Sequence, residues 1–362
     1  MDVNKQSQQA GEGSQQIQAS TIIINQGISE ERVRAIFNEM MPIALERLTK
    51  EGIATASARV EKLGNIMLPR VESVEGMLEA FANPTFLRLL RKAQQAAAIT
   101  EEEADYKLLT ELLVCHVEKE ADRKNMADIS RAIEIVGEID NSALCGLTIM
   151  HAMGVYAPTS GNLDKGLQDL DEMYGKLEYV KLPEGEEWID HLDVLRTIRI
   201  SQVGGFKKFE EYCASFFDGY SCVGIKIDSN DYQKAKELLT KIGIDETKML
   251  VKNDLLDGYC RLPISSRDQI TKLKVREENL KRTVTEQERK ILEDIWRLYE
   301  KNDDLQKYVE KKFVNKWDTY EKLRNIHIWW NLISTGFRIT GIGKMLAHTN
   351  EKRCDSDLPD LV

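Results

Sequence analysis

The sequence contains no long apolar segment. Among its 362 residues, the longest nearly apolar stretch runs from Ile326 to Ile333 and is interrupted by His327 and Asn331. Because a membrane helix needs roughly 20 apolar residues, we expect no transmembrane span. The N-terminus has neither the basic start and apolar core of a secretory signal nor the Arg-rich pattern of a transit peptide. These absences predict a cytoplasmic protein with no membrane contact.

The cysteines lack the spacing of a metal site or a disulfide framework, and none forms a Cys-x-x-Cys motif. Cys115 with His116, or Cys145 with His151, could supply a nucleophile and a base or two metal ligands. Their apolar neighbours favour packed side chains instead. We therefore expect reduced thiols and neither a metal nor a cofactor.

Other catalytic patterns are incomplete. Cys213 and Cys222 flank an aromatic stretch, and structural thiols are favoured over a redox pair in a reducing compartment. Asp228 ends a β-like run, but a nuclease needs further acids to converge on a metal. Gly204-Gly205 and the Gly341 to Lys344 run lack the full phosphate-loop pattern and are interpreted as turn glycines. The catalytic residues are thus unknown, and the sequence favours binding over catalysis.

The composition is that of a globular protein. Hydrophobic residues make up 42% of the chain and charged residues 30%, and the formal net charge is -10. This charge gives no general attraction to nucleic acid.

A short β-forming segment lies near the N-terminus. In residues 14–25, Ile17, Ala19 and Ile23 fall on one face of an extended strand, and Ile22 and Ile24 on the other. The segment has no strand partner nearby in the sequence, and an unpaired apolar strand exposes its edges to other chains. We expect residues 1–27 to form a homo-oligomer, with a trimer preferred.

Helical periodicity dominates the first half of the remaining chain. Ser29 is expected to cap the first helix, and Thr100 and Thr285 each to begin a capping box with an acid three residues later. The fold class we expect is mainly α, and the chain is divided into an oligomerising segment (1–27), a helical domain (28–181), a mixed α/β part (182–280) and a C-terminal module (281–362). The mixed part has β-like runs at Thr197 to Val203, Ser221 to Asp228 and Gly258 to Ile264.

The C-terminal module shows three helical patterns, a strand at Phe337 to Thr340 and a short closing helix at Lys344 to His348. This order resembles a winged helix. Residues 281–350 contain 14 Lys and Arg against 10 Asp and Glu, a local balance of +4. The candidate partner-binding residues are Lys311, Lys312, Lys316, Trp317, Arg324 and His327. Because the predicted helix from Trp317 to Ile333 is aromatic and of mixed charge, a protein partner is favoured over nucleic acid.

Two passages, QQAGEGSQQIQASTIIINQGISEE and FRITGIGKMLAHTN, resemble an uncharacterised family of bacterial cytosolic proteins. Its members share a Gly-Ser-x-x-Ile-Gln-Ala strand before an acidic helix start, and end on a Thr-x-apolar-Gly segment. Such starts are similar to those of proteins associated with mobile elements and phage defence. The resemblance implies an oligomeric, defence-related protein and no particular reaction.

The sequence therefore predicts an oligomeric binding and assembly protein that acts through protein contacts. One alternative is a nucleic-acid-binding regulator that uses the C-terminal module. Another is a defence effector with a hydrolase or nuclease site in residues 182–280.

Overall fold

The computed structural model describes residues 28–46, 50–118, 123–277 and 280–360. The expected oligomerisation residues Ile17, Ala19, Ile22, Ile23 and Ile24 lie outside these ranges. Over the described residues the fold is mainly helical with a few small antiparallel sheets, which confirms the expected fold class. In the same ranges, no helix is long and apolar enough to cross a membrane.

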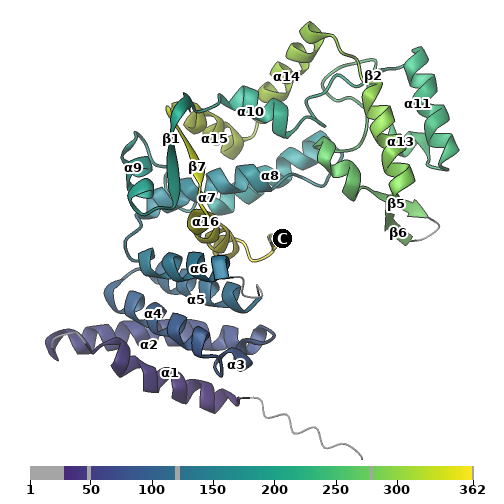
Figure 1. Cartoon of the computed structure of the whole chain (residues 1–362). Coiled ribbons are helices and arrows are strands. Elements are labelled where there is room, and N and C mark those ends of the chain that lie inside the picture. The colour runs from purple at the N-terminus through teal and green to yellow at the C-terminus, as the bar shows by residue number, and fades with distance from the viewer. Residues whose placement is uncertain (1–27, 47–49, 119–122, 278–279, 361–362) are drawn as a thin grey trace, which may run out of the picture.

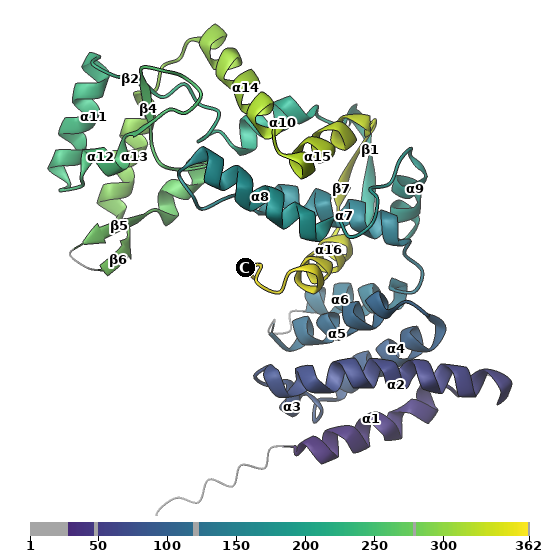
Figure 2. The same ribbon diagram turned by 180° about the vertical axis from the view of Figure 1, so that it is seen from behind.

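The N-terminal part is a stack of helices (Figures 1 and 2). Its elements are α1 (Glu30–Ala44), α2 (Lys50–Ser73), α3 (Met77–Ala80), α4 (Pro84–Ile99), α5 (Glu103–Glu118) and α6 (Arg123–Ile135). Ser29 caps α1 as expected, since its Oγ accepts a hydrogen bond from Arg32 N at 3.3 Å. Apolar side chains of all six helices form the first core, including the buried Phe37, Leu63 and Phe86.

The start of α5 differs from the expected capping box. Thr100 lies three residues before the helix, where its Oγ1 accepts from Glu102 N at 3.2 Å and donates to the Asp105 carboxylate. Asp105 is buried, and burial raises the pKa of its carboxyl group despite the hydrogen bond from Thr100. The Thr100 hydroxyl therefore hydrogen-bonds the buried carboxylate of Asp105 and does not form the expected cap of α5.

The central part combines segments from two distant regions of the chain. It contains α7 (Asn141–Val155), α8 (Leu163–Leu177), α9 (Glu187–Val194), β1 (Ile198–Gly205), α10 (Phe209–Phe216), α14 (Asp303–Trp317), α15 (Glu321–Leu332), β7 (Thr335–Ile339) and α16 (Gly341–Cys354). The antiparallel pair of β1 with β7 places Ile198 opposite Ile339. These elements share the second core, which is rich in aromatic side chains.

Residues 225–277 and 280–297 form a small lobe with a third core. Its elements are β2 (Ile225–Lys226), α11 (Asn230–Lys241), α12 (Glu246–Met249), β3 (Val251–Lys252), β4 (Tyr259–Arg261), the 3-10 helix η1 (Arg267–Lys272), β5 (Lys274–Glu277), β6 (Leu280–Thr283) and α13 (Glu286–Arg297). Of the predicted strand at 221–228, only Ile225 and Lys226 pair, in a sheet of order β2-β4-β3. The capping box of Thr285 and Glu288 is confirmed.

The order of elements expected for residues 281–362 is observed, but these elements do not share one core. Helix α13 packs in the third core, whereas α14 and α15 pack in the second. The predicted helix from Trp317 is in fact divided, because Trp317 ends α14 and its Nε1 donates to Leu323 O of α15 at 2.7 Å. The strand β7 pairs with β1, more than 100 residues earlier in the chain.

The closing helix α16 is longer than expected and lies inside the molecule, between α5 and α6 on one side and α7 on the other (Figure 1). Met345 and Leu346 join the first core, and Ala347 joins the second. The glycines before Lys344 permit this close packing, since a Cβ at Gly343 would collide with the Thr197 carbonyl oxygen. The C-terminal helix therefore joins the N-terminal stack to the central part.

Candidate binding groove

A buried polar network fixes α16 against α7. Glu351 is fully buried, and its two carboxylate oxygens accept hydrogen bonds from His151 Nδ1 at 2.8 Å and from Tyr156 OH at 2.9 Å. Burial, followed by the negative charge of Glu351, raises the pKa of Tyr156, so its hydroxyl stays a donor. His348 Nδ1 lies 3.4 Å from both Glu351 Oε2 and Tyr156 OH.

The network continues along α16 through amide and guanidinium groups. Asn350 is fully buried, and its Nδ2 donates to Thr148 Oγ1 of α7 at 2.8 Å. Arg353 Nε donates to Asn350 Oδ1 at 2.7 Å, and the guanidinium lies 4.5 Å from the centre of the Tyr179 ring. These contacts explain why polar residues that look like a helix end in the sequence continue α16 to Cys354.

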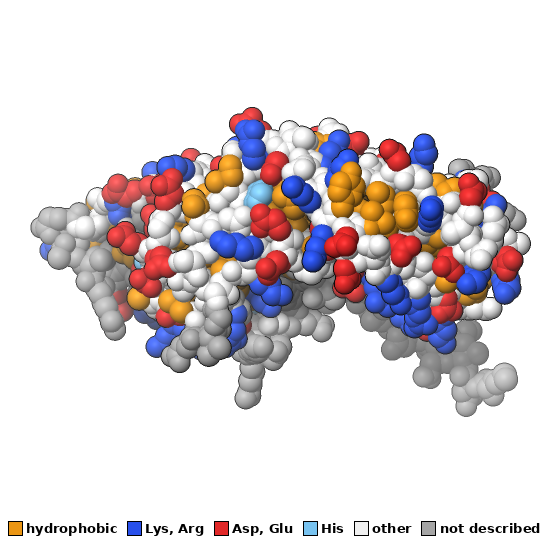
Figure 3. Space-filling view, turned by 90° about the horizontal axis from the view of Figure 1, so that it is seen from above, with side chains coloured by type: hydrophobic (Ala, Val, Ile, Leu, Met, Phe, Trp, Pro, Cys, Tyr) orange, Lys and Arg blue, Asp and Glu red, His pale blue; other side chains and the backbone are white. Residues whose placement is uncertain are grey.

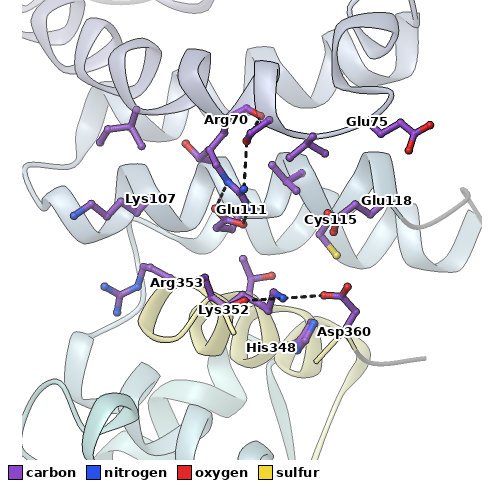
Figure 4. Close-up of a pocket in the computed structure, with 17 residues that line it drawn as sticks. Arg70, Glu75, Lys107, Glu111, Cys115, Glu118, His348, Lys352, Arg353 and Asp360 are labelled. Atoms are coloured by element: carbon purple, nitrogen blue, oxygen red, sulfur yellow. Dashed lines mark hydrogen bonds and ion pairs between the residues drawn. The ribbon is translucent and has the colours of Figure 1, made fainter. Parts of the chain in front are cut away.

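The side of α16 toward α2 and α5 forms one wall of a groove of about 850 Å³, to which His348 and Arg353 of the network also contribute (Figure 4). Helices α2 and α5 form the other walls. The lining residues are Ile66, Arg70, Ser73, Val74 and Glu75 from α2 and the residues after it, Lys107, Thr110, Glu111, Val114, Cys115 and Glu118 from α5, and His348, Thr349, Lys352, Arg353, Ser356 and Asp360 from α16 and its C-terminal extension. The volume is in the range of small-molecule and peptide sites.

Charges of opposite sign lie at the two ends of the groove. Figure 4 shows Lys107 and Arg353 at one end, and Glu75, Glu118 and Asp360 at the other. From Lys107 to Glu118 the α5 wall extends about 16 Å at 1.5 Å per residue. The groove therefore has a basic end and an acidic end.

Between the ends, the charged side chains neutralise one another. Arg70 Nε and Nη2 each donate to a carboxylate oxygen of Glu111 at 3.0 Å, a bidentate pair. Lys352 Nζ lies 3.1 Å from Asp360 Oδ1 and so compensates part of the acidic end.

At the ends, Lys107 pairs with Glu103 of α5 at 2.8 Å, whereas the other groups except Asp360 are less satisfied. Among the described residues, Glu75 and Glu118 form no ion pair. Burial raises the pKa of Glu118, and the nearby charges of Asp360 and Glu111 raise it further. Arg353 Nη2 is buried and has no hydrogen-bond partner in the part of the chain that the structure describes. Because Glu75, Glu118 and Arg353 line the groove, a ligand with a cationic group at the acidic end and an anionic group at the basic end would complement the charge of each end.

The Cys and His pairs considered from the sequence do not form. On α5, Cys115 faces α16, with Sγ 3.4 Å from Met345 Sδ, whereas His116 stacks on Phe86 of α4. On α7, the Cys145 thiol lies 3.6 Å from the carbonyl oxygens of Leu177 and Val180, and burial raises its pKa to about 11.

Instead, Cys115 and His348 line the same groove from opposite walls (Figure 4). They are more than 200 residues apart in the sequence, so neither could be assigned to the other by spacing. The i, i+3 spacing of His348 and Glu351 was the available signal for the polar network, but it required α16 to continue beyond His348.

The other candidate positions are separated. Cys213 and Cys222 are buried free thiols, and burial raises the pKa of each. Asp228 is exposed and follows β2, and among the described residues no group of three or more His, Cys, Asp or Glu side chains is placed to hold a metal. Gly205 ends β1, where it pairs with Thr335.

The six partner-binding residues predicted in the C-terminal module do not form one surface. Trp317 is fully buried, so the predicted partner contact at this residue is wrong. Lys316 forms an ion pair with Asp164 of α8. His327 Nδ1 lies 2.8 Å from Asp318, and its ring stacks on Phe209 at 4.5 Å.

The three remaining predicted residues, Lys311, Lys312 and Arg324, are exposed and stay candidates. Acidic and basic side chains are interspersed over the face that carries α10, α14 and α15 (Figure 3). Binding of the nucleic-acid phosphate backbone requires a continuous basic surface, so this face gives no added support to the nucleic-acid alternative.

A protein-family model matches residues 27–361, and its description names no activity. No curated protein and no solved structure matches the chain.

We expect Glu351→Ala to lower the free energy of unfolding by about 2–5 kcal/mol, because the buried donors of His151 and Tyr156 would lose their acceptor. Glu351→Gln keeps one acceptor oxygen and should lose less. Urea unfolding followed by circular dichroism measures the effect. As a control, Glu237→Ala at an exposed position of α11 should change stability by no more than about 0.5 kcal/mol. Equal stability of the Glu351→Ala and Glu237→Ala variants would show that the network does not hold α16.

Proposed function

Since the chain belongs to the family whose model matches residues 27–361, and the description of that family names no activity, we propose a function from the chain's own features. It is an oligomeric binding and assembly protein that acts through protein contacts. The N-terminal segment assembles the copies, and the groove between α2, α5 and α16 receives a segment of a protein partner.

The charge pattern of the groove is the observation that carries the binding role. Glu75 and Glu118 at one end lack ion-pair partners among the described residues, and Arg353 Nη2 at the other end lacks a hydrogen-bond acceptor there. An extended peptide advances about 3.3–3.6 Å per residue, so five or six residues span the α5 wall. The partner segment therefore carries a basic and an acidic side chain a few positions apart.

The sequence supports assembly through residues 14–25. Each buried isoleucine contributes roughly 1.5–3 kcal/mol, whereas ordering the backbone costs about 1–2 kcal/mol per residue. One isolated copy of the strand should therefore stay unfolded, whereas strands from several copies can form each other's edge hydrogen bonds. A closed ring, with three copies preferred, leaves no edge for further addition.

A role in bacterial phage defence and a location in the cytoplasm belong to the same proposal. The resemblance of the first and last segments to defence-associated proteins supports the role. The six free cysteines, five of them buried, fit a reducing compartment.

The assembly role predicts that Ile17→Asp with Ile23→Asp reduces the particle to one chain of 41.4 kDa, because two charges cannot be buried between strands. The helical content should remain nearly unchanged. Analytical ultracentrifugation and circular dichroism measure both quantities. Gln8→Asp with Gln9→Asp adds the same charge outside the strand of residues 14–25 and should keep the full mass. A double Ile variant that keeps the full mass would exclude this strand as the assembly element.

The binding role predicts a charge pattern in peptides selected from a random library by the full-length protein. We expect enriched sequences to carry Lys or Arg about four to six positions from Asp or Glu, the span of the groove at 3.3–3.6 Å per residue. Glu118→Lys with Arg353→Glu should abolish this enrichment, because both ends then repel the selected charges. Exposed Glu237→Lys is the matched control. Enrichment without paired charges, or enrichment that survives the double variant, would contradict the assignment of the groove.

A further inference from the structure

A second cavity lies on the other side of α5, between α4 and α6, and has a volume of about 700 Å³. It is lined by Asn83, Thr85, Arg88 and Lys92 from the start and outer face of α4, by His116 from α5, and by Met126, Ala127, Ser130, Arg131 and Glu134 from α6. Because α5 presents Cys115 to the groove and His116 to this cavity, the two sites are separate.

The charge of this cavity is predominantly positive. Its lining contains three cationic side chains, those of Arg88, Lys92 and Arg131, and one carboxylate, that of Glu134. Lys92 and Arg131 both form ion pairs with Glu134, and these pairs lower the pKa of its carboxyl group against the opposing effect of burial. Arg88 is exposed and forms no ion pair with the described residues, so a guanidinium remains for a ligand.

Neutral donors add to the cations. Ser130 Oγ accepts a hydrogen bond from Lys92 Nζ at 2.7 Å, which leaves its own proton for a ligand. His116 is 8% exposed, and its Nδ1 has no hydrogen-bond partner among the described residues. Burial lowers the pKa of His116, and a neutral imidazole still offers one N–H donor.

We propose that this cavity binds a phosphate-bearing small molecule. Two arginines, a lysine and several neutral donors match the many acceptor oxygens of a phosphate group, which arginine binds in a bidentate manner. A single inorganic ion would occupy a small part of 700 Å³. The ligand is therefore an oligophosphate or a nucleotide, with Met126 and Ala127 available to its apolar part. This inference does not depend on the proposed groove function.

Isothermal titration of the full-length protein with pyrophosphate, ATP and adenosine at physiological salt tests the proposal. Both phosphate compounds should bind and adenosine should not. Similar affinities for pyrophosphate and ATP would identify the phosphates as the recognised group, and tighter binding of ATP would identify a nucleotide. Binding of adenosine as tightly as ATP, or no binding of either phosphate compound, would overturn the proposal.

Variants locate the binding site. Arg131→Gln and, separately, Arg88→Gln should each weaken binding about tenfold or more, because each removes a charge-assisted contact. Arg88 is on the surface, so its replacement leaves the fold intact. Arg91→Gln is the matched control, since Arg91 is exposed on the same helix but does not line this cavity. If Arg91→Gln weakens binding as much as Arg88→Gln does, the phosphates bind a general basic surface and the assignment fails.

Discussion

The hydrogen bonds that Glu351 of α16 accepts from His151 and Tyr156 of α7 are the contact on which the arrangement depends. They lie where the first and second cores meet, so they fix α16 between the N-terminal stack and the central part. A fully buried carboxylate is costly unless it is hydrogen-bonded, and in this network both oxygens have donors. The same network aligns the outer face of α16, which forms one wall of the groove.

Helix α5 gives the molecule two distinct sites. Adjacent residues Cys115 and His116 point to opposite sides, one into the bipolar groove and the other into the basic cavity. The groove has balanced charge with unlike ends, which suits a peptide with both charges. The cavity has mainly cations and hydrogen-bond donors, which suits phosphate. Because the two sites differ in charge, we expect them to bind two different classes of ligand.

Several local features of the fold could be predicted from the sequence, although the capping box at Thr100 was wrong, and the long-range features could not be predicted. Ser29 and Thr285 cap their helices as expected, because capping depends on the next three or four residues. The pairing of β7 with β1 and the burial of Thr349 to Glu351 depend on segments more than 100 residues away. Without those partners, the polar end of α16 looks solvent-exposed and Trp317 looks like a surface aromatic. The charged ends of the groove likewise come from three helices that no sequence spacing connects.

Native-state hydrogen exchange tests most directly whether α16 is an integral layer of the fold. In the intact protein, amides of residues 345–354 should be protected as strongly as those of α7, since both helices open only when the cores separate. Helix α11 of the small lobe, which buries only Ala235 and Leu239, should exchange faster and provides an internal reference. Exchange of α16 at the rate of α11, with α7 still protected, would show that α16 detaches on its own and is not an integral layer of the fold.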